Sequence, residues 1–182
     1  VGEGAMAAII GLDTDKIKEI CAETANMTNQ CVQAVNFNCP GQIVIAGATE
    51  AVHKACDRLK EAGAKRAILL PVSAPFHSTL MQPAADRLKE VLDSVEIVDA
   101  KIPVVANVNA KPETKADEIR SQLVLQAASP VLWEDSVRRM MNDGVDTFVE
   151  VGPGKVLCGF IKKVDRSYAP LNVEDMESLE QK

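Results

Sequence analysis

The sequence is organised around one stretch, Pro71-Val72-Ser73-Ala74-Pro75-Phe76-His77-Ser78. An apolar run over residues 67–70 precedes it and a run with helical periodicity follows it, so His77 lies where a strand gives way to a helix. Open α/β sheets place their chemistry at such strand ends. A lone histidine is only half of a catalytic pair, because a base also needs a nucleophile and an orienting acceptor. A structural histidine at a strand end is the alternative interpretation.

Residues 1–72 have the pattern of a small sheet with two helices. Strands are predicted over 6–12, 31–36, 42–47 and 67–72. Helices follow the first and third strands, and the residues spaced to face the sheet are Ile17, Ile20, Cys21 and Thr24 in one and Val52, Ala55, Cys56 and Leu59 in the other. The order β-α-β-β-α-β is the split βαβ pattern of ferredoxin-like folds.

Short polar side chains and glycines mark the predicted ends of these elements. Asp13 or Thr14 is predicted to cap the first helix and Thr49 the second, because a short side-chain oxygen can accept a bond from the free N–H groups of the first turn. The segment Asn38-Cys39-Pro40-Gly41 has turn chemistry and joins the second and third strands as a hairpin. Gly63 is predicted to end the second helix.

Residues 73–182 alternate helices and short strands, which predicts part of a parallel sheet covered on both faces. Ser78 or Thr79 is predicted to cap a helix whose apolar face runs from Leu80 to Leu92. Further helices are predicted over 117–127, 134–142 and 156–164, strands over 102–106, 147–151 and 168–173, a loop over 107–114 and a frayed acidic tail over 174–182. Two or three strands are too few for a complete sheet. This half is therefore predicted to be one flank of a larger α/β domain.

Composition excludes several classes of function. The net charge of −6 and the 3% aromatic content disfavour nucleic-acid binding, which needs a basic face and stacking platforms. The apolar runs are too short to span a bilayer, and no secretory signal opens the chain, so no membrane association is expected. Five scattered cysteines without metal-ligand spacing suit a reducing cytoplasm. No metal and no cofactor are expected.

Other candidate sites have favoured structural alternatives. Ser78 is adjacent to His77 and is better read as a helix cap than as its nucleophile, and no G-x-S-x-G elbow occurs. The N–H groups of Gly152-Pro153-Gly154-Lys155 could bind an anion, but a tight strand-to-helix turn explains the segment. The amides in residues 36–42 could recognise carbonyl or phosphopantetheine-type groups, or only satisfy nearby backbone. Cys39 has no adjacent cation and is not expected to be a reactive thiolate.

Three segments in a fixed order form a combined signature: NFNCPGQIVIAG at 36–47, VSAPFHSTLM at 72–81 and EVGPGKVL at 150–157. With this order and spacing the chain closely resembles the malonyl-CoA–acyl carrier protein transacylase family of type II fatty acid synthesis. The resemblance extends from about Gly4 to Asn172. Three co-linear motifs are far more specific than any one alone.

The resemblance implies an α/β-hydrolase-like large subdomain, whose C-terminal part is 73–182, with a ferredoxin-like small subdomain (1–72) inserted. It implies transfer of malonyl from malonyl-CoA to a serine and then to the phosphopantetheine thiol of acyl carrier protein. His77 matches the family base, and Gln126 matches the residue whose backbone carbonyl holds that base. Asn36 and Asn38 match amides that line the cleft between subdomains. Phe76 resembles the residue that favours malonyl over bulkier acyl groups.

Three parts of the family pattern are absent from the sequence: the G-H-S-x-G elbow with its nucleophile, the arginine that pairs with the malonyl carboxylate and the glutamine of the oxyanion hole. In the family all three precede the position of Val1. The chain also opens directly on a predicted strand, so we expect a missing N-terminal segment of the same protein and no activity from this chain alone. The alternative function is a non-catalytic ferredoxin-like module that binds a ligand or partner. A methylmalonyl-type polyketide acyltransferase is disfavoured by Phe76.

Overall fold

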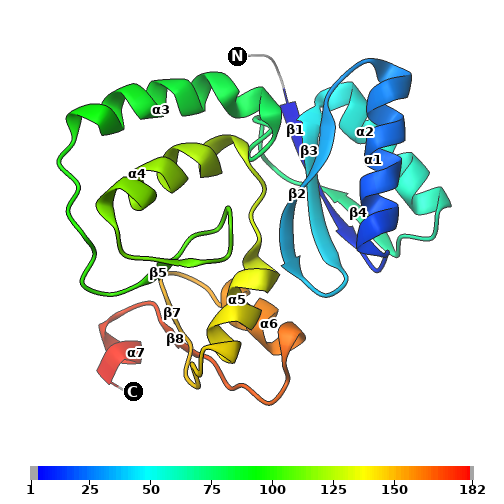
Figure 1. Ribbon diagram of the computed structural model, residues 1–182. Helices are drawn as coiled ribbons and strands as arrows, with labels where there is room; N and C mark the ends of the chain where they lie inside the picture. Colours follow the sequence, from blue (N-terminus) through cyan, green and yellow to red (C-terminus); the bar gives the residue numbers. More distant parts are fainter. Residues whose placement is uncertain (1–3, 181–182) are drawn as a thin grey trace.

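The predicted β-α-β-β-α-β order is confirmed by the first six elements of the computed structural model, which describes residues 4–180 (Figure 1). These elements are β1 (Gly4–Ile10), α1 (Thr14–Thr28), β2 (Val32–Cys39), β3 (Gln42–Ala48), α2 (Thr49–Glu61) and β4 (Arg66–Leu69). The strands form one sheet in the order β2-β3-β1-β4, and every neighbouring pair is antiparallel. Two crossovers through α1 and α2 produce this order, since each helix joins strands that are not neighbours.

Both faces of this sheet are buried. Ala5, Ala7 and Ile9 of β1 pack with α1 and α2, whereas Met6 and Ala8 lie in a second cluster on the opposite face. This alternation follows from the period of two in a strand. The residues predicted to face the sheet from the two helices are all buried, namely Ile17, Ile20, Cys21, Thr24, Val52, Ala55, Cys56 and Leu59.

The helix ends follow the predicted chemistry in two of three cases. Asp13 caps α1, because one of its carboxylate oxygens accepts from the backbone N–H of Asp15 at 2.9 Å and of Lys16 at 3.2 Å. Gly63, at φ 104°, ends α2 in a Schellman motif. The prediction that Thr49 caps α2 is wrong, because Thr49 is the first helical residue. The N-cap position is occupied by Ala48, whose side chain has no acceptor. Pairing of β3 continues to Ala48, so the strand runs directly into the helix.

Several strands begin or end at other residues than predicted, because a strand extends only as far as its partner strand pairs with it. The first strand covers 4–10 rather than 6–12, because Ile10 pairs with Gln42, the first residue of β3. The second strand continues to Cys39, since it pairs with β3 up to the hairpin turn. The fourth strand ends at Leu69, because Pro71 has no N–H to donate to a ladder.

The second half of the chain contains helices separated by very short strands. Its elements are η1 (Thr79–Met81), α3 (Gln82–Ser94), β5 (Val104–Val105), β6 (Pro112–Glu113), α4 (Ala116–Leu125), η2 (Gln126–Ala128), α5 (Trp133–Asn142), β7 (Val149–Val151), α6 (Val156–Val164), β8 (Leu171–Val173) and α7 (Met176–Glu180). Each predicted helix is present to within a few residues. None of the helices within residues 4–180 is long and apolar enough to cross a membrane.

Three predictions for the architecture of this half are wrong. The segment 107–114 is not all loop, because Pro112–Glu113 forms β6 and pairs antiparallel with β5. Among the short strands of residues 71–180, β7 and β8 pair parallel and β5 and β6 pair antiparallel, so they form two separate pairs rather than one parallel sheet. The acidic tail was expected to fray, yet its residues 176–180 form α7, where Ser178 bonds to Asp175. Residues 181–182 of the tail lie outside the described part of the chain.

The core of the second half is small. Val137, Phe148 and Ile161 are buried together, and the ring of Tyr168 meets Phe148 edge-on at 5.5 Å between centroids. Along α3 only Ala85 is buried. Large apolar side chains elsewhere in this half remain exposed, notably Val98, Ile102, Val104, Val151 and Val156.

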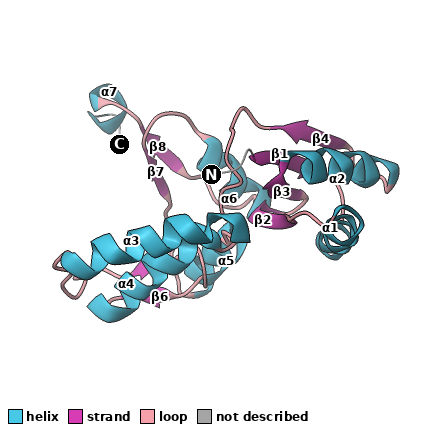
Figure 2. Ribbon diagram, turned by 90° about the horizontal axis from the view of Figure 1, so that it is seen from above, coloured by secondary structure: helices cyan, strands magenta, loops and turns pink. Residues whose placement is uncertain are grey.

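The two halves meet along β2. The backbone N–H of Phe37 donates to the carbonyl of Val131 at 2.9 Å, and the N–H of Val131 donates to the carbonyl of Val35 at 2.7 Å. This parallel bridge pairs Val131 with Asn36. Figures 1 and 2 both show α1 and α2 on one side of the sheet and α5 and α6 on the other. The second half therefore lies against the sheet face that the two helices leave free.

Candidate active site

His77 lies in the connection between β4 and η1, at the third position of the turn Pro75-Phe76-His77-Ser78. The N–H of Ser78 donates to the carbonyl of Pro75 at 3.3 Å, and His77 has a φ of 62°. Type II turns require a positive φ at this position, where glycine or asparagine is usual. A histidine there costs about 1–3 kcal/mol of backbone strain, and such strain is concentrated at functional sites.

The structure brings His77 and Gln126 together. The distance between the His77 Nδ1 and the Gln126 carbonyl oxygen is 3.0 Å. A carbonyl has no hydrogen to give, so Nδ1 carries the proton and donates it, which leaves Nε2 of the neutral ring as an acceptor. The Gln126 carbonyl is near the end of α4, where backbone carbonyls lack partners within the helix. A histidine held in this tautomer can take a proton at Nε2.

Ser78 precedes η1 without a side-chain cap bond, and Thr79 is the first residue of η1, so the prediction that one of them caps the helix is wrong. The hydroxyl of Ser78 is fully buried and donates to the carbonyl of Pro75 at 2.7 Å, and it makes no bond to His77. The backbone N–H of Thr79 donates to the Oε1 of Gln33 at 2.9 Å. The sequence reasoning missed Gln33. Its only signal was a polar residue in an otherwise apolar stretch of β2.

Asn36 lies on the sheet face that meets the second half. It pairs with Val44, and directly paired residues share a face. The Oδ1 of Asn36 is buried and free to accept a hydrogen bond. Asn38 falls in a register irregularity near the end of β2 and is partly exposed. Within residues 4–180 no hydrogen bond joins either asparagine to His77.

Phe76 precedes His77 in the turn, and its side chain is 44% exposed. The ring is therefore available to a ligand or to another segment of protein. Cys39, near the other end of β2, is buried, and burial raises the pKa of its thiol. A thiol with a raised pKa is a weaker nucleophile at neutral pH, in agreement with the prediction that Cys39 is not reactive.

The segment Gly152-Pro153-Gly154-Lys155 is a structural turn. The N–H of Gly154 donates to Glu174 at 3.0 Å, and the N–H groups of Leu157 and Cys158 donate to Glu150 at 3.1 and 2.8 Å. The bond from Cys158 is the main reason why the pKa of Glu150 lies below its usual value. Carboxylates of the chain itself thus accept the hydrogen bonds that these N–H groups would otherwise donate to a bound anion.

The sequence matches the acyl transferase domain family over residues 1–180. It is 50% identical over 179 residues to a malonyl CoA-acyl carrier protein transacylase from Bacillus subtilis, covering 98% of this chain and 56% of that protein. The corresponding protein of Escherichia coli K12 is 52% identical over 163 residues, with coverages of 90% and 52%. The chain thus spans about half the length of the curated relatives that it matches.

Solved structures of malonyltransferases are also similar to this chain. An acyl-carrier-protein S-malonyltransferase from Burkholderia pseudomallei superimposes with a TM-score of 0.94 at 46% identity, covering 100% of this chain and 58% of the other. A malonyl-transacylase in complex with a type II polyketide synthase acyl-carrier protein gives a TM-score of 0.95 at 47% identity, covering 99% and 58%. The likeness therefore includes the overall α/β fold.

Proposed function

This chain belongs to the acyl transferase domain family, and we propose that it forms the C-terminal part of a cytoplasmic malonyl-CoA–acyl carrier protein transacylase. Residues 1–72 constitute the ferredoxin-like small subdomain of that enzyme. Residues 73–182 constitute the C-terminal part of its α/β-hydrolase-like large subdomain. A preceding segment, of which the relatives have the equivalent, supplies the nucleophilic serine and the arginine for the malonyl carboxylate.

One observation carries the proposal: the bond from His77 Nδ1 to the Gln126 carbonyl, at the end of a strained turn. It supports a general base with a fixed tautomer and with Nε2 available. A backbone carbonyl here takes the place of the carboxylate in a Ser-His-Asp triad. It orients the ring, and as a dipole it stabilises the imidazolium less than a full negative charge would.

In the first half-reaction, Nε2 of His77 accepts the proton of the serine hydroxyl as its oxygen attacks the malonyl thioester carbonyl. The carbon–sulfur bond then breaks, and the imidazolium returns the proton to the coenzyme A thiolate. In the second half-reaction, Nε2 takes the proton of the phosphopantetheine thiol, whose sulfur attacks the malonyl ester. The serine oxygen leaves with that proton, so atoms and charge balance.

The positions of three residues support a proposed role in substrate binding. Asn36 is proposed to donate and accept hydrogen bonds in the cleft between the subdomains, since its Oδ1 is buried and unpaired. Asn38 is proposed to line the same cleft nearer the hairpin turn. Phe76, adjacent to the base, is proposed to limit the size of the acyl group next to the reacting carbonyl.

The exposed apolar side chains of the second half support a preceding segment that packs there. Ile102, two residues before β5, is 77% exposed, and Val151, the last residue of β7, is 81% exposed. Large apolar surfaces on a folded chain mark interaction sites. A segment of roughly 100 residues is enough to cover such surfaces and to complete a sheet of ordinary size.

The proposal is tested by replacing His77 in the complete protein, meaning this chain joined to its preceding segment. His77→Ala should lower malonyl transfer by about 10²–10⁴-fold, the usual contribution of a general base. Gln126→Ala is the matched control and should have a much smaller effect, because the alanine retains the carbonyl. A His77→Ala enzyme that transfers malonyl at the wild-type rate would refute the role. Robust transfer by the 182-residue chain alone would refute the need for a preceding segment.

A further inference from the structure

The turn that carries His77 is closed by bonds within itself. The hydroxyl and the N–H of Ser78 both donate to the Pro75 carbonyl, at 2.7 and 3.3 Å. These bonds fix the shape of the turn. They do not fix its place relative to the sheet, because both partners belong to the turn.

The start of the turn is held against β1. The N–H of Gly4 donates to the carbonyl of Ser73 at 3.3 Å. A Cβ atom at Gly4 would overlap the Pro75 ring, so the turn lies directly on the backbone of β1. This contact fixes the residues before His77. It does not hold the residues after His77, which need another partner.

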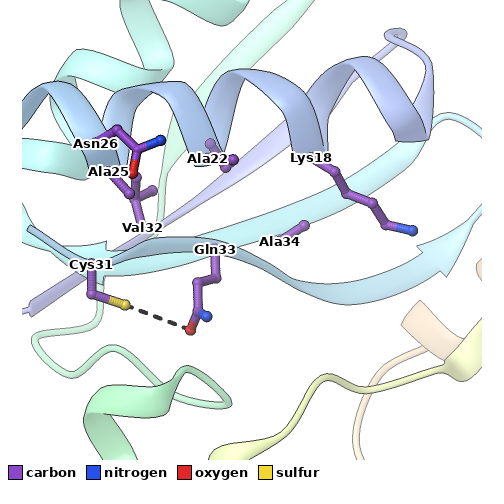
Figure 3. Close-up of a pocket in the computed structure, with 9 residues that line it drawn as sticks. Lys18, Ala22, Ala25, Asn26, Cys31, Val32, Gln33 and Ala34 are labelled. Carbon is purple, nitrogen blue, oxygen red and sulfur yellow. Dashed lines mark hydrogen bonds between the residues drawn. The ribbon is translucent and has the colours of Figure 1, made fainter.

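The end of the turn is held by a side chain from β2. The Oε1 of Gln33 accepts from the Thr79 N–H at 2.9 Å and from the Thr79 hydroxyl at 3.2 Å. Cys31 places its Sγ 3.5 Å from the same oxygen. Figure 3 shows Cys31 and Gln33 on the side of β2 away from α1, pointing toward the segment that follows the turn. A single amide oxygen thus receives three donors.

We propose that Gln33 is a positioning residue for His77, acting through Thr79. The inference rests on the proposed function of His77 as a base. Thr79 is two residues from His77, and Gln33 anchors it to the same strand that carries Asn36. Without this anchor the end of the turn is released, and His77 relaxes from its positive φ and loses the Gln126 carbonyl. No hydrogen bond joins Gln33 to His77 in the described part of the chain, so the proposed effect of Gln33 is on the orientation of the ring.

The kinetic test compares Gln33→Leu with Gln33→Glu in the complete protein. Leucine is similar in size but lacks an acceptor, whereas glutamate keeps an acceptor oxygen at the same distance along the side chain. Gln33→Leu should lower kcat about three- to tenfold, equivalent to one hydrogen bond, and leave KM for malonyl-CoA within about twofold. Gln33→Glu should keep kcat close to the wild-type value. If Gln33→Leu fails to fold, Gln33→Met provides the same comparison.

A second measurement does not depend on activity. The Nδ1-bound proton of His77 should give a distinct NMR resonance in the 182-residue chain, because it is held in a hydrogen bond to Gln126. The resonance should persist in Gln33→Glu and broaden or shift in Gln33→Leu. An unchanged resonance together with unchanged kcat in Gln33→Leu would overturn the proposal, as would equal losses in the leucine and glutamate variants. Absence of malonyl transfer by the wild-type protein would instead refute the proposed function, and the NMR comparison would still test the anchor.

Discussion

The two halves of the molecule differ in how completely each buries its apolar side chains. In residues 4–70, both faces of a four-stranded sheet are covered, and Ile45, Val52 and Leu59 are fully buried. In residues 71–180, three buried residues form the main cluster, and Ile102 and Val151 are largely exposed. Burial of apolar surface is the main driving force of folding. The first half therefore holds its own core, whereas the second half leaves large apolar side chains exposed.

Hydrogen exchange should show the largest difference between the halves. In the 182-residue chain, amides of β1 and β3 should exchange more slowly than those of β5 and β7 by about 10³-fold or more, because short, partly exposed strands open at low free-energy cost. Addition of the preceding segment should slow exchange in the second half and leave β1 unchanged. Equal protection of both halves in the 182-residue chain would contradict the inferred difference in their stability.

A pair of truncations tests the same difference by stability. Leu59→Ala should lower the free energy of unfolding by about 2–5 kcal/mol, since its side chain is fully buried. Ile102→Ala should change it by no more than about 0.5 kcal/mol, because its side chain is exposed. Urea denaturation measures both. In the complete protein the Ile102→Ala effect should grow, and its failure to do so would mean that this surface stays uncovered.

Acid should loosen the second half first. The four carboxyl groups with a lowered pKa in the described part of the chain are all there, namely Glu150, Asp99, Asp165 and Asp175. Hydrogen bonds to backbone or side-chain donors lower each pKa. A lowered folded-state pKa stabilises the fold above the ordinary carboxyl pKa, and this stabilisation is lost as the pH falls through the folded value.

The measurement is hydrogen exchange or urea denaturation at a series of pH values from 7 to 3. Protection of α6 should fall as the pH drops below the ordinary carboxyl range, while β1 should change little. Glu150→Gln should flatten this dependence at α6, because glutamine has no charge to lose. A wild-type α6 that is equally protected at pH 7 and pH 3 would contradict the assignment.

The smallest predicted effect concerns the helix caps. Asp13→Ala should lower the free energy of unfolding by about 1 kcal/mol, because it removes the acceptor for two N–H groups of α1. Thr49→Ala is the matched control and should cost little, since Thr49 makes no cap bond. Thermal unfolding of the two variants gives the comparison. A larger loss from Thr49→Ala would mean that its hydroxyl acts in another way.

The sequence predicted what depends on local chemistry. The buried faces of α1 and α2 follow from spacing, and Asp13 follows from its short acceptor side chain. Strand ends could not be predicted as well, because they depend on where the partner strand stops. The β5–β6 pair was not predicted, because strands with only two paired residues have no detectable periodicity in the sequence.

The site was predictable only in part. His77 stood out as a rare residue at a strand end, but its contact with Gln126 joins positions 49 residues apart and came from the family resemblance alone. Ser78 was misjudged because a serine before a helix usually caps it, whereas here tertiary packing buries the hydroxyl within the turn. The one signal at Gln33, a polar residue in an apolar stretch, could not predict its role, since that role depends on where Thr79 lies in space.

The bridge between Val131 and β2 has a consequence for self-association. β2 is an edge strand of eight residues, long enough to template pairing with a strand from another molecule. Val131 occupies the N–H of Phe37 and the carbonyl of Val35, so the middle of that edge is already paired. A bound segment there shields the sheet against edge-to-edge aggregation. Disruption of the bridge should therefore reveal itself as loss of solubility at high concentration before it appears as loss of fold.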